Sequence, residues 1–152
     1  MDKLLQVLMG AVGTLGFCVL FNIRGKKLPL AVLGAALSWA LCVALESVVA
    51  GEPMRWFISA MFVAMWAEVL ARVLKTPATT FLIPGIIPHI PGGALYNTMR
   101  LALERQWSAC LSRAFYTLRL ALSLAMGIIV VHSVWVLAQK IIMKCMYPKV
   151  KA

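Results

Sequence analysis

The sequence predicts an all-α membrane protein with about five transmembrane helices, one of them broken by a proline- and glycine-rich motif. Of its 152 residues, 62% are hydrophobic, and the mean hydropathy is +0.91, whereas ordinary soluble domains are about 45–50% apolar. Several stretches approach the ~20 apolar residues that cross a bilayer. A soluble fold would need a larger core than a chain of this length can enclose. We therefore expect residues 1–152 to form a single transmembrane domain.

The charged residues and cysteines argue against nucleic-acid binding and against an enzyme. The net charge of +10 comes from 15 Lys+Arg against 5 Asp+Glu. Most of the basic residues lie between and after the apolar stretches, where they meet lipid headgroups and fix topology, and no nucleic-acid recognition motif accompanies them. The four cysteines form no C-x-x-C pair and fit small buried side chains or free thiols. Since no nucleophile–base set or phosphate loop is present either, we expect no enzyme activity, cofactor, metal or nucleic-acid partner.

The first two predicted spans, residues 4–21 and 30–50, carry small residues at helical spacing. In the first span these are Gly10, Gly13, Thr14 and Gly16, and in the second they are Ala36, Ala40 and Ala44 together with Gly34 and Ser38. Such residues let membrane helices approach closely. The turn between the spans is short and basic, and Pro29 suits the first turn of the second helix. Because this basic cluster follows the first span, we expect that span to be retained and not cleaved as a signal peptide.

Acidic residues inside the predicted spans are candidates for proton coupling. A charge at the membrane centre costs about 2.5–3.5 kcal/mol on insertion scales, so such residues are usually functional. In the third span, residues 56–74, Glu68 can pair with Arg72 one turn later, and we favour this structural explanation. Glu46 lies near the outer end of the second span without a partner in its own helix. It is the better proton-coupling candidate, although an interfacial role explains it equally well. The remaining acids, expected to be exposed, are Asp2, Glu52 and Glu104.

The last part of the chain is expected to form an interfacial extension followed by the final span. Residues 97–113 are too polar to cross a membrane, so we expect them to continue the preceding helix to the interface and then turn. The final span covers residues 114–138 and contains His132, which we expect to be a satisfied packing residue. A basic tail begins at Gln139.

The remaining predicted span, residues 79–99, is the one that a continuous helix explains least well. The stretch from Pro77 to Tyr96 holds four of the seven prolines and three glycines. An interior proline costs about 3 kcal/mol in a helix, and an unpaired backbone group in lipid finds no water. The segment must therefore be buried in protein or line a wet cavity. We expect two half-helices joined by an unwound connection.

This break predicts a substrate-binding or gating site. A helix starting near Gly93 would offer free N–H groups to an anionic substrate group, with Tyr96 and Asn97 in its first turn. His89 is the only titratable group within the break and could relay protons. The alternative is a proline-kinked helix whose gaps are filled by neighbours, with His89 simply hydrogen-bonded. The candidate binding or gating residues are Pro84, Gly85, Pro88, His89, Pro91, Gly92, Gly93, Tyr96 and Asn97, and the proton-coupling candidates are His89, Glu46 and Glu68.

The string IPGIIPHIPGGALYNTM, residues 83–99, resembles the signature of the threonine/serine exporter family, as do the preceding basic residue, Thr76 and Pro77. The similarity is to the family's C-terminal membrane half, which also occurs as a separate small subunit of about this length. It extends over nearly the whole chain. The resemblance implies a proton-driven secondary exporter of small polar metabolites such as threonine, serine or a dicarboxylate. It also implies a bacterial inner-membrane location and a larger partner subunit that resembles the N-terminal half.

The distribution of basic residues predicts the topology only in part. It places the 23–29 turn in the cytoplasm and the N-terminus outside. Nine basic residues fall inside and six outside whether residues 79–99 cross the membrane or are re-entrant. The family resemblance implies five spans, and hence a cytoplasmic C-terminus. Two other functions stay open, namely a non-transporting membrane assembly or interaction protein, which the small-residue faces motivate, and a homo-oligomeric channel.

Overall fold

The computed structural model describes residues 3–146, with side chains as far as residue 141, and over this range the chain consists of helices and short connections. The all-α prediction is confirmed. The helices are α1 (Lys3–Leu20), α2 (Lys27–Ala44), α3 (Glu52–Val73), α4 (Thr79–Ile86), α5 (Gly92–Leu103) and α6 (Trp107–Met146), with the 3₁₀ turns η1 (Leu45–Ser47) and η2 (Ile87–His89). Four stretches of the described chain are long and apolar enough to cross a membrane: Lys3–Leu20, Lys27–Ser47, Glu52–Val73 and Trp107–Ile141. The end of the predicted basic tail, residues 147–152, lies outside the described range.

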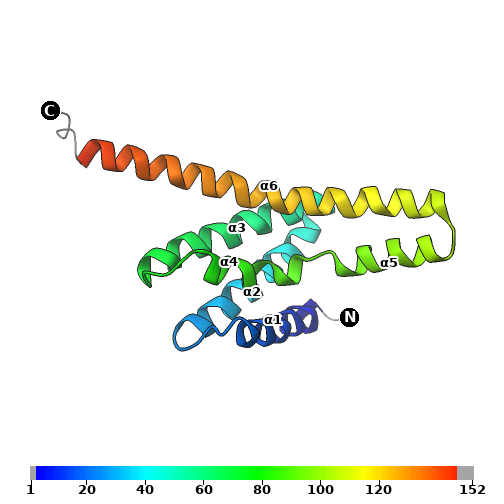
Figure 1. Ribbon diagram of the computed structural model, residues 1–152, viewed down its shortest axis with the longest axis horizontal. Helices are drawn as coiled ribbons and strands as arrows, with labels where there is room; N and C mark the ends of the chain where they lie inside the picture. The colour runs from blue at the N-terminus through cyan, green and yellow to red at the C-terminus, as the bar shows by residue number, and fades with distance from the viewer. Residues whose placement is uncertain (1–2, 147–152) are drawn as a thin grey trace.

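Helices α3 and α6 lie side by side and run in the same direction (Figure 1). Tyr116 of α6 contacts Glu52 at the start of α3, and His132 contacts Glu68 near its end. The close crossing depends on Gly127, because a Cβ at this position would lie 2.6 Å from the Phe57 carbonyl oxygen. Backbone cannot retreat from such a contact as a flexible side chain can, so the sequence needs glycine there.

Small residues also bring α2, α3 and α4 together. A Cβ at Gly34 of α2 would lie 2.5 Å from the Trp66 Nε1 atom of α3, and the same indole N–H donates to the Leu30 carbonyl at 3.1 Å. In α2, the Ser38 hydroxyl is fully buried and lies 3.5 Å from the Gly85 carbonyl of α4. Close backbone approach thus replaces large side chains in this part of the core, as the predicted small-residue face of the second span requires.

The segment from α4 to α5 is broken as predicted, and it runs from one end of the bundle to the other (Figure 1). Pro84 lies inside α4, where it removes the hydrogen bond to the Thr80 carbonyl. Helix α4 ends at Ile86, η2 follows with Pro88 in its first turn, and α5 starts at Gly92 with Pro91 as its N-cap. The prolines therefore divide the segment into two helical pieces, each too short to span a bilayer.

The connection between α5 and α6 differs from the prediction. Helix α5 ends at Leu103, Arg105 takes a left-handed conformation with φ 57°, and α6 starts at Trp107. Residues 107–113 therefore belong to the last helix and do not continue the preceding one. The turn is closed by hydrogen bonds from the Gln106 amide to Leu101 and from the Arg105 amide to Ala102. Since the turn contains neither proline nor glycine, its composition gave no signal of its position. Figure 1 shows the α5–α6 hairpin extending past the ends of α1, α2 and α3.

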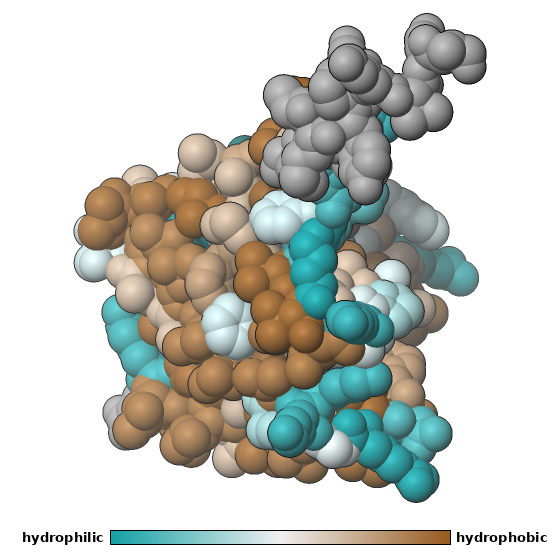
Figure 2. Space-filling view, turned by 90° about the vertical axis from the view of Figure 1, so that its left-hand side faces the viewer, coloured by the Kyte–Doolittle hydropathy of each residue, from teal (hydrophilic) through white to brown (hydrophobic). Residues whose placement is uncertain are grey.

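The outer surface is largely apolar. Large hydrophobic side chains such as Leu4, Val12, Val73 and Ile129 are more than half exposed. Contiguous apolar surface of this kind meets lipid or another protein. Hydrophilic groups collect at the end that carries the α1–α2 turn, where Figure 2 shows them next to apolar surface. The basic residues Arg24, Lys26 and Lys75 belong to the two turns at this end, and Lys27 is the first residue of α2.

Candidate functional site

A cavity of about 290 Å³ lies where the α4–α5 segment is broken. We call it the break cavity. Five of the predicted site residues line it, namely Pro88, Pro91, Gly92, Gly93 and Asn97. The other walls come from Trp39 of α2, the start of α3, and Arg113, Tyr116 and Leu120 of α6. The cavity lies toward the end of the bundle where α3 begins, since η2 extends the first half of the segment by another turn.

The start of α5 presents unpaired backbone donors to the break cavity. The amides of Gly93 and Ala94 make none of the turn or cap hydrogen bonds found in the described chain, and both residues line the cavity. The first N–H groups of a helix carry a partial positive charge and bind anions. A Cβ at Gly92 or Gly93 would meet no atom within 4 Å. These two glycines are therefore not needed for packing within the chain, and they leave the backbone open to a ligand.

Charged side chains of both signs also line the break cavity. Glu52 begins α3 and accepts a hydrogen bond from the Tyr116 hydroxyl of α6. The Arg113 guanidinium lies 5.4 Å from the centre of the Tyr116 ring. The cavity therefore offers a carboxylate, a guanidinium and free amides within one small volume. Such a set can hold a small solute that carries both an anionic and a cationic group.

His89 is buried beside the break cavity and does not line it. Its side chain is 0% exposed, and neither ring nitrogen has a hydrogen-bond partner among the described residues. The ring is held edge-on by Trp39, at 5.4 Å between ring centres, and by Trp56 at 6.1 Å. The hydrogen-bonded His89 of the simple kinked-helix alternative is therefore not what the structure contains. Trp39 and Trp56 line the break cavity, and His89 lies behind them. We call these three packed rings the plug.

The other predicted binding or gating residues lie elsewhere. Gly85 packs against α3, since a Cβ there would lie 2.6 Å from the Val63 Cγ1 atom. Tyr96 is 68% exposed and does not line the break cavity. It does not lie in the first turn of α5, because that helix starts at Gly92. The motif thus combines packing residues, cavity residues and an exposed aromatic residue.

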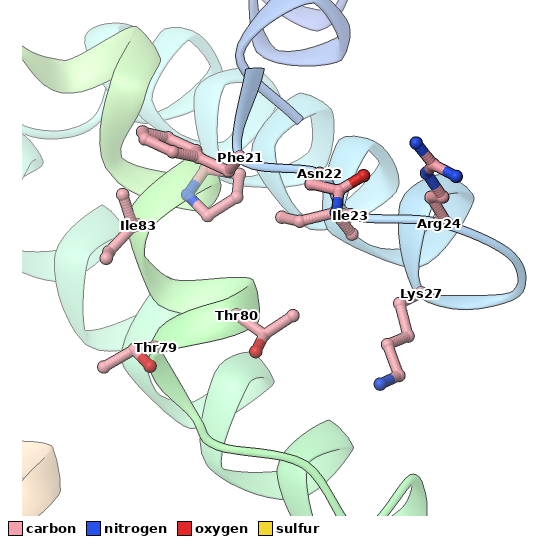
Figure 3. A pocket seen from close by; sticks show the side chains of 9 residues that line it. Phe21, Asn22, Ile23, Arg24, Lys27, Thr79, Thr80 and Ile83 are labelled. Atoms are coloured by element: carbon pink, nitrogen blue, oxygen red, sulfur yellow. The ribbon is translucent and has the colours of Figure 1, made fainter. Parts of the chain in front are cut away.

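Pro84 lines a second cavity, of about 450 Å³, on the α4 side of the break in the α4–α5 segment. We call it the turn cavity, because the α1–α2 turn forms one wall. Figure 3 shows Asn22, Ile23, Arg24 and Lys27 on this wall and Thr79, Thr80 and Ile83 of α4 on the other. The Lys27 ammonium extends toward the α4 side, whereas the Arg24 guanidinium is turned away from the threonines (Figure 3). One cavity therefore lies at the start of the broken segment and the other at its break.

Of the proton-coupling candidates, Glu46 has an interfacial environment. It lies in η1, and its side chain is 55% exposed. Its carboxylate is 3.2 Å from the Lys3 ammonium and 3.9 Å from the Arg55 guanidinium. The absence of a partner within its own helix is thus compensated by basic residues of α1 and α3. Sequence spacing could not reveal these partners.

Glu68, the third proton-coupling candidate, makes two charged or titratable contacts. Its pairing with Arg72 is confirmed, with 2.7 Å between the Arg72 Nη1 and Glu68 Oε2 atoms. The second contact was not predicted, and it joins Glu68 Oε1 to the Nδ1 atom of His132 at 2.8 Å. His132 is therefore not the packed residue that we expected, since its side chain is 65% exposed.

Sequence reasoning missed several residues of the break cavity. Glu52 was expected to be exposed, but it is only partly so and binds Tyr116 at a sequence separation of 64 residues. Neither the role of Tyr116 nor that of Arg113 follows from local pattern, because the pairing of α3 with α6 sets both. The tryptophans that enclose His89 carry no motif either. No cluster of three or more potential metal ligands occurs among residues 3–141.

Comparison with known proteins identifies a family. The sequence model of the family described as Threonine/Serine exporter, ThrE, matches residues 6–134. This range includes most of α1, all of α2 to α5, most of α6, and every residue of the break cavity. No curated protein and no solved structure matches the chain.

Proposed function

Because this chain belongs to the threonine/serine exporter family, we propose that it is the membrane subunit of a secondary exporter for small polar metabolites. An exporter-type transporter and a multi-pass membrane protein follow from the family and from the apolar helices. The solute, the partner and the energy source, which we take to be a proton gradient, are the parts that we propose.

The break cavity carries the proposal for the solute. An α-carboxylate would be received by the free amides of Gly93 and Ala94 and by Arg113, and an ammonium group by Glu52. Asn97 could hydrogen-bond a side-chain hydroxyl. A dicarboxylate would bring a second negative charge toward Glu52, at an electrostatic cost. The mixed charges therefore favour a hydroxy amino acid such as threonine or serine over a dicarboxylate.

The two cavities support a transport path along the broken segment. Helix α4 lines the turn cavity, whereas η2 and α5 line the break cavity. Between them, Gly85 is in close contact with Val63, and His89 is enclosed by Trp39 and Trp56. We propose that this buried region is the barrier that separates the two openings, and that alternate opening on its two sides moves the solute.

The surface of α1 supports a partner subunit. A Cβ added at Gly13 or Gly16, two members of the predicted small-residue face, would meet no described atom within 4 Å, whereas one at Gly10 would contact Pro88 and Trp39. We propose that a larger membrane subunit covers this face in the bacterial inner membrane. In this arrangement the chain crosses five times, with its N-terminus outside and its C-terminus in the cytoplasm. The basic α1–α2 turn would then lie on the cytoplasmic side.

The experiment measures the flux of radiolabelled threonine from liposomes that contain this chain and the partner with which it co-purifies. We expect efflux of radiolabelled threonine down a gradient, competition by serine, and weak competition by succinate. Arg113→Gln should lower this flux at least tenfold, because it removes a charged contact to the carboxylate worth about 1.5–3 kcal/mol. Arg100→Gln is the matched control, since Arg100 lies on the same hairpin, pairs with Glu104 and does not line the break cavity.

The outcomes separate the three functions. Equal flux through the Arg113→Gln and wild-type complexes would refute the binding site. Solute-selective conduction by this chain alone would indicate a homo-oligomeric channel. A stable complex without flux of threonine, serine or succinate would indicate an assembly protein.

A further inference from the structure

Glu68 lies in a polar cluster between α3 and α6, in which its two carboxylate oxygens have different partners. The Arg72 Nη1 atom donates to Glu68 Oε2 at 2.7 Å and to the Glu68 carbonyl at 2.6 Å. Its guanidinium also lies 4.4 Å from the centre of the Trp135 ring. With the Gln139 amide oriented so that its oxygen faces Arg72, that oxygen accepts from Arg72 Nε at 2.9 Å. Arg72 thus has contacts on several sides and binds one carboxylate oxygen of Glu68.

The second carboxylate oxygen of Glu68 has a different kind of partner. Glu68 Oε1 contacts the Nδ1 atom of His132 at 2.8 Å. The His132 side chain is 65% exposed, whereas that of Glu68 is 10% exposed. The imidazole therefore connects the outer surface of α6 with a buried carboxylate. Imidazole exchanges protons near neutral pH, which neither a guanidinium nor an amide does.

The Glu68–His132 pair also lies against the broken segment. Both residues line a small cavity of about 150 Å³ together with Ala78, Thr79 and Leu82 of the α4 region. Thr79 lines the turn cavity as well. The first turn of α4 therefore separates the pair from the proposed solute path. A change of charge on the pair would therefore face this turn across the small cavity.

The other two proton-coupling candidates are placed less favourably. Protonated His89 would have no carboxylate in contact with it among the described residues, and a buried unpaired charge is costly. Glu46 is exposed and already binds Lys3 and Arg55. Around Glu68, by contrast, the titratable and charged groups in contact within the described part of the chain are Arg72 of α3 and His132 of α6, and the cavity residues from α4 are uncharged. One proton on His132 is therefore balanced by the Glu68 carboxylate.

We propose that the Glu68–His132 pair is the proton-binding site of the exporter. His132 takes up the proton, Glu68 balances its charge, and Arg72 holds Glu68 in place. The imidazole becomes an imidazolium on one side of the transport cycle and returns the proton on the other. The proposal rests on the proposed function, since it assigns the coupling residue of that transporter.

The test uses liposomes with the complete complex and two assays of radiolabelled threonine. The first is exchange against unlabelled threonine at equal pH on both sides, which needs solute movement without net proton movement. The second is accumulation against a threonine gradient, driven by a pH difference. His132→Asn keeps an amide N–H near the Nδ1 position but cannot take up a proton. We expect it to retain exchange within twofold and to lose at least tenfold in pH-driven accumulation. Glu104→Gln, an exposed acid on the hairpin, should change neither.

The results decide whether the Glu68–His132 pair binds the coupled proton or only stabilises the structure. Retained pH-driven accumulation in His132→Asn would overturn the proposal, and so would loss of exchange in both His132→Asn and His132→Gln, which would indicate a structural role. Exchange by the wild type without any effect of a pH difference would overturn the proton site alone. Absence of both activities from the wild-type complex would refute the proposed function itself.

Discussion

Substitution of Gly85 by alanine tests whether this motif glycine is a packing residue. The added Cβ would lie 2.6 Å from the Val63 Cγ1 atom, far inside van der Waals contact. Val63 is 1% exposed and β-branched, so its side chain has little freedom to rotate away. Overpacking of this kind costs about 1–3 kcal/mol. We therefore expect Gly85→Ala to lower the free energy of unfolding by that amount.

The matched experiment combines Gly85→Ala with Val63→Ala. The smaller side chain makes room for the new methyl group, so the cost of Gly85→Ala should fall by about 0.5–3 kcal/mol in this background, the range typical of contacting pairs. Equilibrium unfolding in mixed detergent micelles measures all four variants. Gly93→Ala is the control, since its Cβ would meet no atom within 4 Å. An equal cost of Gly85→Ala in both backgrounds would show that Val63 is not what the glycine accommodates.

Two further substitutions test the core and the plug by the same unfolding measurement. His89→Leu should keep stability or raise it by about 1–3 kcal/mol, because it removes two buried nitrogens that lack partners among the described residues; a large loss would reveal a hydrogen bond to His89 that the structure does not contain. Gly127→Ala should destabilise the chain more than Gly13→Ala, because the first drives a methyl group into the Phe57 carbonyl and the second meets open space; equal losses would argue against the close crossing of α3 and α6.

The sequence was sufficient to predict the helical class, the broken segment and its two half-helices. Those features depend on hydropathy and on the local chemistry of proline, which act within a few residues. Glu68 and Arg72 were also predictable as a pair, since they lie one turn apart on one helix.

The remaining site residues could not be predicted, because they depend on which helices pack together. Tyr116 reaches Glu52 and His132 reaches Glu68 only because α3 and α6 run in parallel with Gly127 at their crossing. The motif glycines show the same limit. Gly85 and Gly93 are both glycines of the same motif, and nothing in the sequence distinguishes their roles. In the structure Gly85 packs against Val63, whereas Gly93 lines an open cavity.

The most direct test of solute binding at the break cavity is protection of a cysteine placed in it. Gly93→Cys would be made in a chain whose Cys110 and Cys145 are replaced by serine, and labelled with a membrane-impermeant maleimide in the complete complex. We predict that threonine slows labelling at position 93 at least fivefold, and that it leaves the labelling of Glu104→Cys unaffected, since Glu104 is exposed on the α5–α6 hairpin and does not line the break cavity. Labelling of position 93 at the same rate with and without saturating threonine or serine would contradict a solute site in the break cavity.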